Sequence, residues 1–265
     1  MKKNLLIANS RYKVKALVVR AAGTNCDQET LHALTVAGAE CELVHLNQVL
    51  MGRVRLHPFH VLVFPGGFSY GDDISAGKVF ALELRLRLKD QLKAFVKSKK
   101  LVIGVCNGFQ ILLKSGLLPG FDVIDEQQKA TLTINRSGRF QCEWVGLKIE
   151  KSAASWLYTL PLHIQLPIAH GEGRFITATP KVLTSLKQNN QIVLRYAPQN
   201  PNGSEDNIAG ICNKDGNVIG LMPHPERFLT RFEHPNWTAQ DAVQEGGDGL
   251  LFWREAINYA KQHLN

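Results

Sequence analysis

The chain has 265 residues, 45% of them hydrophobic, which is enough to build one large α/β domain. Its formal net charge is +8, but the basic residues are spread out and not interleaved with aromatics, so specific nucleic-acid binding is not expected. Most of this charge is expected on solvated helix faces, with docking onto an acidic subunit as the alternative. No apolar run reaches membrane-spanning length, and the five cysteines contain no C-x-x-C. These features argue against a membrane protein, a disulfide framework and a metal site, and they indicate a cytoplasmic location.

The first half alternates strands and helices. Residues 1–13 are expected to form a flexible leader, followed by a single domain at 14–265. The first helix should begin at Asn25 as N-cap, with Gln28 at its third position resembling a capping box. In chain order we expect a strand at Lys15–Arg20, a helix that stops at Gly38, strands at 41–45 and 61–64, and a helix at 79–96. This β-α-β order with short apolar strands predicts a parallel sheet.

A glycine-rich segment, P-G-G-F-S-Y-G-D at 65–72, follows directly on the third strand. Two adjacent glycines after a buried strand can turn backbone N–H groups toward an anion. The alternative is an ordinary tight turn, which is the more common use of such residues.

The segment around Cys106 carries the clearest chemical signal. Leu101–Val105 reads as a strand and Asn107–Ser115 as a helix, and Gly104 and Gly108 flank the cysteine in the G-x-C-x-G spacing of a nucleophile elbow. Such a sharp turn needs glycine where a Cβ would collide, and it places the sulfur at a helix N-terminus, where a thiolate is favoured. The alternative is a buried core cysteine without chemistry.

The second half is rich in strands and lacks the alternation with helices. Short or alternating apolar segments predict a largely antiparallel region, and Asp215-Gly216-Asn217 predicts a hairpin turn. The expected strands lie within 131–149, 163–169, 191–196, 208–213 and 218–222, ahead of a final helix at 250–263. No linker-like segment divides the chain.

A nucleophilic cysteine needs a base, and the base needs an orienting partner. Among the nine histidines, His224 stands out, because it lies in M-P-H-P-E-R, pinned between two prolines directly after a strand. Glu226 can fold back onto its imidazole, which predicts a Cys106–His224–Glu226 triad. The alternative is a rigid loop with a surface ion pair.

The motifs G-V-C-N-G-F-Q, P-G-G-F-S-Y-G-D and P-H-P-E-R, in this order, resemble class I (triad) glutamine amidotransferases, and among them the glutaminase subunits of phosphoribosylformylglycinamidine synthases. Further matches lie in G-T-N-C-D at 23–27, N-R-S-G-R-F at 135–140, A-H-G-E-G-R-F at 169–175 and N-P-N-G-S at 200–204. The resemblance runs from about Val14 to the C-terminus. It implies a flavodoxin-like fold: an open, mostly parallel sheet flanked by helices, with antiparallel strands in the second half.

The resemblance also implies a reaction. Cys106 would attack the side-chain amide of glutamine, release ammonia and leave a thioester that water hydrolyses to glutamate. Gly67 and Asn107 would supply the N–H groups of an oxyanion hole, and Gln110 would hold the substrate. His170 is expected at the substrate or at a subunit contact, as are four further polar residues: Asn135, Ser137, Arg139 and Arg174.

Partners are implied as well. Ammonia would pass to an ATP-dependent, PurL-like synthetase subunit that converts formylglycinamide ribonucleotide to formylglycinamidine ribonucleotide in purine biosynthesis, and a small PurS-like subunit would assist assembly. This chain lacks a G-x-x-x-x-G-K-[ST] phosphate loop, so ATP and magnesium are expected on the synthetase subunit and no cofactor here.

The sequence departs from the family pattern in three places: Ala21-Ala22 before the first glycine, the extra leader, and a long segment at 231–246. None of them touches the expected triad, but they leave partner docking open. Two other functions also stay open, namely another triad amidotransferase or cysteine hydrolase of the same fold, and a non-catalytic basic binding protein.

Overall fold

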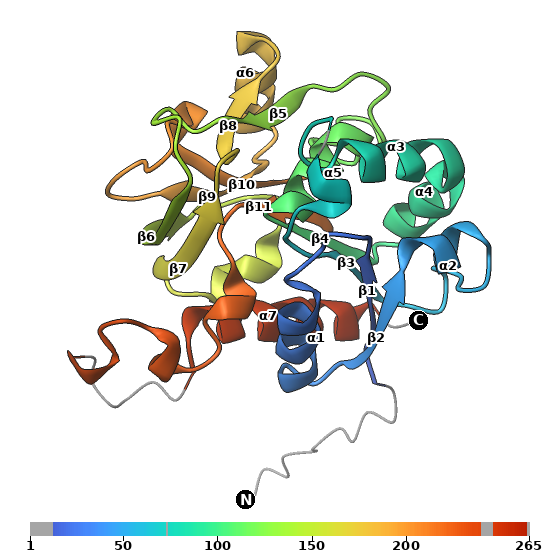
Figure 1. The fold of residues 1–265 in the computed structure, drawn as a ribbon, viewed down its shortest axis with the longest axis horizontal. Coiled ribbons are helices and arrows are strands. Elements are labelled where there is room, and N and C mark those ends of the chain that lie inside the picture. Colours follow the sequence, from blue (N-terminus) through green and yellow to red (C-terminus); the bar gives the residue numbers. More distant parts are fainter. Residues whose placement is uncertain (1–12, 73, 240–245, 264–265) are drawn as a thin grey trace, which may run out of the picture.

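A nine-stranded sheet forms the centre of the computed structural model (Figure 1), which describes residues 13–72, 74–239 and 246–263. Five neighbouring strands are parallel, in the order β2-β1-β3-β4-β11. The sheet continues as β10-β9-β6-β7, in which each strand is antiparallel to its neighbour. The strands are β1 (Lys15–Arg20), β2 (Glu40–His45), β3 (Val61–Phe64), β4 (Leu101–Val105), β6 (Gln141–Ile149), β7 (His163–His170), β9 (Ile192–Tyr196), β10 (Ile208–Cys212) and β11 (Val218–Leu221). The expected mixed sheet is confirmed.

Helices cover both faces of the parallel part. The helices are α1 (Asp27–Val36), α2 (Leu46–Leu50), α3 (Lys78–Arg87), α4 (Lys89–Lys97), α5 (Asn107–Ser115), α6 (Pro180–Gln188) and α7 (Asp248–Gln262). In Figure 1, α1 and α7 lie together on one face, and α3 and α5 pack against each other on the opposite face. Every residue of β3 and β4 is buried, because a strand covered on both sides has no solvent-facing position.

The parallel register brings four chain segments to one edge of the sheet. Because β1, β3, β4 and β11 run in the same direction, their carboxyl ends lie side by side. The segments that follow these strands include G-T-N-C at 23–26, P-G-G-F at 65–68, Cys106, and P-H-P-E at 223–226. This edge is where ligands bind in open α/β sheets, so the fold itself gathers the candidate residues.

The helix expected at 79–96 is wrong in one respect: two helices, α3 and α4, occupy this stretch and meet at Leu88, whose φ is −122°. Leu84, Leu88 and Leu92 are all buried. The apolar spacing therefore continues unchanged across the break, and periodicity could not reveal it. Helices α2 and α6 have no counterpart among the expected elements.

The expected capping box at the first helix is wrong. Helix α1 begins at Asp27 with Cys26 as its N-cap, and no side chain caps it. The Asn25 side chain is instead turned to the Cys26 thiol, which donates to its Oδ1 at 3.3 Å. The predicted end of the helix is correct, since Gly38 follows at φ +97°.

The second half forms the antiparallel part of the sheet, and the hairpin turn predicted at 215–217 joins β10 to β11. Part of the stretch 131–149 lies elsewhere: β5 (Ala130–Thr133) pairs with β8 (Arg174–Thr177) in a separate two-stranded sheet. The main sheet thus takes strands from both halves of the chain. Most of the expected leader, residues 1–12, and residues 240–245 lie outside the described residues.

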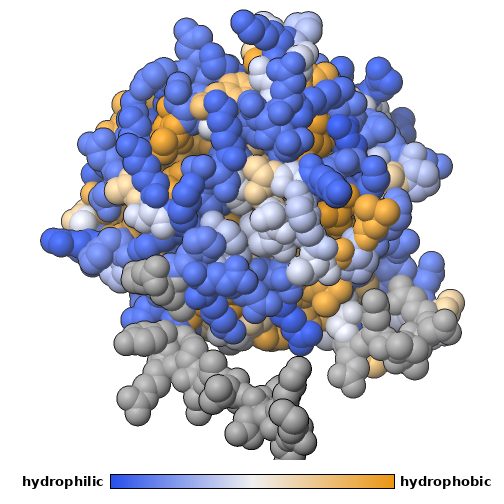
Figure 2. All heavy atoms as spheres, turned by 180° about the vertical axis from the view of Figure 1, so that it is seen from behind, coloured by the Kyte–Doolittle hydropathy of each residue, from blue (hydrophilic) through white to orange (hydrophobic). Residues whose placement is uncertain are grey.

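Hydrophilic side chains cover most of the face shown in Figure 2, with separate hydrophobic groups between them. Within residues 13–72, 74–239 and 246–263, no helix has both the length and the apolar character needed to cross a bilayer.

Candidate active site

Cys106 occupies a strained position at the junction of β4 and α5, with φ +52° and ψ −106°. A non-glycine residue held at positive φ costs free energy, of order 1–3 kcal/mol, and such residues cluster at functional sites. The two flanking glycines are required by close approach. A Cβ on Gly108 would lie 1.8 Å from the carbonyl oxygen of Phe64, and one on Gly104 would lie 2.6 Å from the backbone of Gly108. The geometry is that of the predicted elbow, with strand, nucleophile position and helix packed too closely for larger residues.

His224 and Glu226 form the pair that the sequence predicted. Nδ1 of His224 lies 2.7 Å from Oε1 of Glu226, and both residues are buried. The backbone N–H of His224 donates to the carbonyl of Pro167 at 2.9 Å, which fixes the loop against β7. Burial disfavours a charged ring, but the negative charge of the Glu226 carboxylate outweighs this effect, with smaller contributions from Cys106 and Cys26, and the pKa of His224 is raised well above its usual value.

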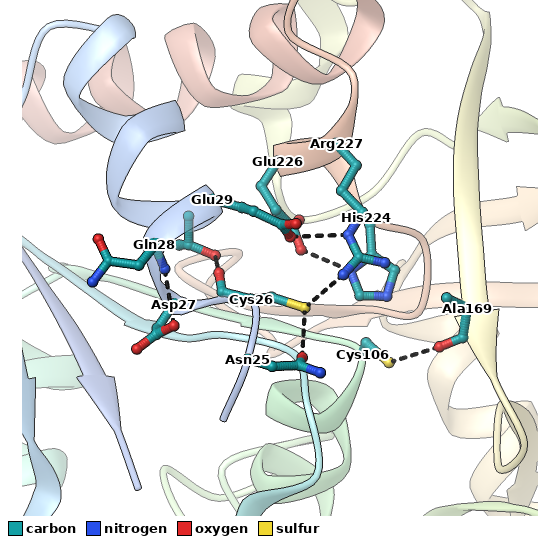
Figure 3. A network of polar contacts seen from close by, with 11 residues as sticks. Asn25, Cys26, Asp27, Gln28, Glu29, Cys106, Ala169, His224, Glu226 and Arg227 are labelled. Carbon is teal, nitrogen blue, oxygen red and sulfur yellow. Dashed lines mark hydrogen bonds and ion pairs between the residues drawn. The ribbon is translucent and has the colours of Figure 1, made fainter. Parts of the chain in front are cut away.

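Cys106 and His224 line the same pocket (Figure 3). The position that a Cβ would take on Gly66 is 2.9 Å from Cε1 of His224 and 3.4 Å from Cβ of Cys106, so only a glycine-sized gap separates the two side chains. The Cys106 sulfur is turned to the carbonyl of Ala169, at 3.8 Å. Nε2 of His224 is buried and has no hydrogen-bond partner among the described residues, so it is open to a proton from the thiol.

The charge of Glu226 should set the pH range of the reaction. Glu226→Gln keeps an acceptor for Nδ1 but removes the carboxylate that raises the pKa of His224, so this pKa should fall. Because the expected reaction requires the imidazolium, the alkaline limb of kcat/KM moves to lower pH in the variant. The measurement is a pH profile of both proteins. An alkaline limb at the same pH in both would show that this carboxylate does not control the ring.

The predicted oxyanion-hole residues come from two loops that are tied together. Gly67 lines the pocket after β3, and Asn107 begins α5, where backbone N–H groups have no helical acceptor. The Asn107 side chain accepts from the Ser69 hydroxyl at 2.6 Å and donates to Gln110 at 2.9 Å. This side chain therefore fixes the glycine loop to the elbow, which holds both N–H donors at one edge of the sheet.

Gln110 and His170 also line the pocket. The Gln110 amide is engaged at both ends, since Oε1 accepts from Asn107 and Nε2 donates to the carbonyl of Glu172 at 2.9 Å. His170 is buried, which lowers its pKa to about 4, so the ring is neutral near pH 7. Its Nδ1 lies 3.1 Å from Oδ1 of Asn135. Both residues are placed for substrate contact, which stays a prediction.

The other four expected polar residues are not among those that line the pocket. Asn135 has a clear structural role, because its Oδ1 accepts from the N–H of Gly173 and its Nδ2 donates to the carbonyl of His170. Ser137 and Arg139 are exposed in the neighbouring turn, and Arg174 lies in β8. They shape or surround the loop that carries His170.

Two residues of the pocket were missed by sequence reasoning. Cys26, at the N-terminus of α1, is buried beside His224, and Arg227 donates to its sulfur at 3.2 Å. Arg227 also donates to Glu29 at 2.9 Å, so it links α1 to the loop of the triad. The order of the strands accounts for the place of Cys26, because it follows β1, whose carboxyl end lies at the same edge of the sheet as the elbow.

The pocket between these segments has a volume of about 360 Å³, within the range of small-molecule sites. It is large enough for an amino acid. Its lining residues are Asn25, Cys26, Gly67, Phe68, Asp72, Ala76, Cys106, Gln110, Phe140, Ala169, His170, Gly171, Glu172, His224 and Arg227.

Comparison with known proteins shows the family to which the chain is similar. Residues 13–260 match the family model described as CobB/CobQ-like glutamine amidotransferase domain. The chain is 43% identical over 261 residues to phosphoribosylformylglycinamidine synthase subunit PurQ of Dehalococcoides mccartyi, covering 94% of this chain and 99% of that protein. It is 42% identical over 270 residues to the PurQ subunit of Treponema denticola, covering 93% and 99%. A chain in the structure of PurLQS from Thermotoga maritima is 33% identical, with a TM-score of 0.70 over 96% of this chain and 100% of that one.

Proposed function

This chain belongs to the CobB/CobQ-like glutamine amidotransferase family, and from that membership we infer that it acts as the glutaminase subunit of a phosphoribosylformylglycinamidine synthase in purine biosynthesis. One observation supports this function most strongly. A single pocket contains Cys106, at a strained strand–helix elbow, and His224, which is bonded to the buried carboxylate of Glu226. Its relatives share nearly their whole length with it.

We propose the following roles for the site residues. Cys106 transfers its proton to His224 and attacks the side-chain amide carbon of glutamine, and His224 then protonates the departing ammonia. Glu226 holds the ring in orientation and stabilises its charged form. The N–H groups of Gly67 and Asn107 stabilise the negative charge that develops on the amide oxygen. Water, activated by the same histidine, hydrolyses the thioester to glutamate.

Gln110 and His170 are proposed to orient the substrate. His170 is suited to this as a neutral ring, because it can accept a hydrogen bond through its buried, unpartnered Nε2. A charged ring at this place would compete with the charge on His224.

The ammonia passes to partner subunits. The solved relative is described as a PurLQS structure, and this chain is assigned the same kind of partners, a PurL-like synthetase and a PurS-like small subunit. We propose that ATP and magnesium bind to the synthetase, since thioester chemistry at the triad needs neither. A cytoplasmic location, where purine synthesis enzymes meet their substrates, is part of the proposal.

Reconstitution with the cognate synthetase and small subunits tests this function. Formylglycinamidine ribonucleotide should form from formylglycinamide ribonucleotide, ATP and glutamine, with one glutamate released for each product. Omission of this chain should abolish the glutamine-dependent reaction but leave the reaction with free ammonium salt. Glutamine hydrolysis that the synthetase does not affect would favour another amidotransferase or hydrolase of this fold, and no hydrolysis at all would favour a binding protein.

A further inference from the structure

Three side chains from separate segments converge beside Gly66, which has no side chain of its own. The position that a Cβ would take on this glycine is 3.1 Å from Sγ of Cys26, 2.9 Å from Cε1 of His224 and 3.4 Å from Cβ of Cys106. All three residues are at least nine-tenths buried, with exposed fractions of 1%, 1% and 7%. Two thiols and an imidazole therefore share one small, enclosed space, although the triad uses only one of the thiols.

The histidine in this cluster is oriented as a metal ligand. Its Nδ1 is bonded to the Glu226 carboxylate, and its Nε2 is buried without a partner among the described residues. Metal-binding histidines characteristically pair their second ring nitrogen with a carboxylate, which fixes the ring and raises its basicity. One ligand atom each from Cys26, His224 and Glu226 lies within 4.8 Å of the other two.

We propose that this cluster is a binding site for a thiophilic divalent cation such as Zn²⁺, held by Sγ of Cys26, Nε2 of His224 and Sγ of Cys106. Thiolate and imidazole ligands in tetrahedral geometry are the set that zinc prefers. Cys106 must turn about its Cα–Cβ bond, away from Ala169, to complete the site. Both thiols release their protons to solvent on binding, as does Nε2 of His224 when the ring is charged, and no electron transfer is involved.

The charges around the cluster suit this occupant. The two thiolates balance the 2+ charge of the cation, and Glu226 remains bonded to the ring outside the ligand set. The guanidinium of Arg227 donates to Sγ of Cys26 at 3.2 Å, which offsets part of the cost that burial places on the thiolate form. Occupancy would remove the nucleophile and the base together, so the bound cation blocks glutamine hydrolysis reversibly. This consequence rests on the proposed function, whereas the binding itself does not.

Cobalt and zinc titrations of the full-length chain, kept reduced with a phosphine, test the site. We expect one Co²⁺ per chain, with thiolate-to-cobalt charge-transfer absorption in the near ultraviolet that Zn²⁺ abolishes by displacement. Cys26→Ala should roughly halve this absorption and weaken Zn²⁺ binding about 100-fold, as measured by competition with a chromophoric chelator. The matched control is Cys41→Ala, which removes a half-buried thiol on β2. It should change neither the cobalt absorption nor the affinity for Zn²⁺.

Equal Zn²⁺ affinity of the wild type and the Cys26→Ala chain would overturn the proposal, and so would the absence of thiolate-to-cobalt absorption. Cys26→Ser serves as the second variant if the alanine variant does not fold. In the reconstituted enzyme, the Zn²⁺ concentration for half-inhibition should rise in Cys26→Ala by the same factor as the dissociation constant. If the chain binds Zn²⁺ as expected but does not hydrolyse glutamine, the proposed function is rejected and the proposed metal site is still supported.

Discussion

Replacing Cys106 with alanine should abolish glutamine-dependent amidine formation. The proposed thioester cannot form without the sulfur, and removing the nucleophile of such a triad costs about 10⁶ in kcat. Alanine fits the space of the cysteine at the elbow, so folding should persist even though the strained φ of +52° remains. The measurement is glutamate and amidine production by the reconstituted enzyme, with thermal unfolding of the isolated chain as the check on folding.

Two controls separate loss of chemistry from loss of assembly. The Cys106→Ala complex should still make amidine from free ammonium salt, because the synthetase subunit is intact. Cys142→Ala, which removes an exposed thiol on β6, should keep full glutamine-dependent activity. Undiminished glutaminase activity in the Cys106→Ala chain would mean that another residue is the nucleophile.

The elbow could be predicted from sequence because its constraints are local. The glycines at 104 and 108 are needed within two residues of Cys106, and the strand and helix on either side have unmistakable apolar patterns. The pairing of His224 with Glu226 could be predicted equally well, since the two residues are only two positions apart and a proline on each side of His224 restricts the backbone. A functional element whose residues are close together in the sequence can therefore be predicted from the sequence alone.

The position of Cys26 could not be predicted in the same way. Its place beside His224 depends on the order of strands in the sheet, because β1 and β11 are separated by β3 and β4 and only their shared direction brings their ends to one edge. Sequence pattern predicts strands but not their order. The expectation of no metal site considered only cysteine spacing along the chain, so it could not detect a cluster assembled from three loops.

Two predictions from local sequence patterns were wrong because tertiary contacts determine the structure at those positions. The break between α3 and α4 at Leu88 keeps the apolar spacing, so nothing in the pattern marks it. The Asn25 side chain had the sequence of a helix cap, but in the structure it lies at the pocket and bonds to Cys26. Asn25 therefore lines the pocket and does not cap helix α1.

Replacing His224 with alanine should be nearly as damaging as losing the cysteine, with a fall of about 10⁵–10⁶ in kcat. The ring is expected both to take the proton of the thiol and to deliver it to the leaving ammonia, and no other described histidine is bonded to Glu226. Without it, the thiol of Cys106 has no base to take its proton. The rate at which iodoacetamide alkylates Cys106 should therefore fall in His224→Ala, because the thiolate is the reactive form.

The alkylation rate gives this prediction a readout that a folding defect would not reproduce. A loosened pocket would expose the sulfur and accelerate its alkylation, whereas loss of the base slows it. Glu226→Ala should give an intermediate result, because it leaves the imidazole in place but unoriented. If alkylation of Cys106 is as fast in His224→Ala as in the wild type, the sulfur draws its reactivity from its position at the N-terminus of α5 and not from the ring.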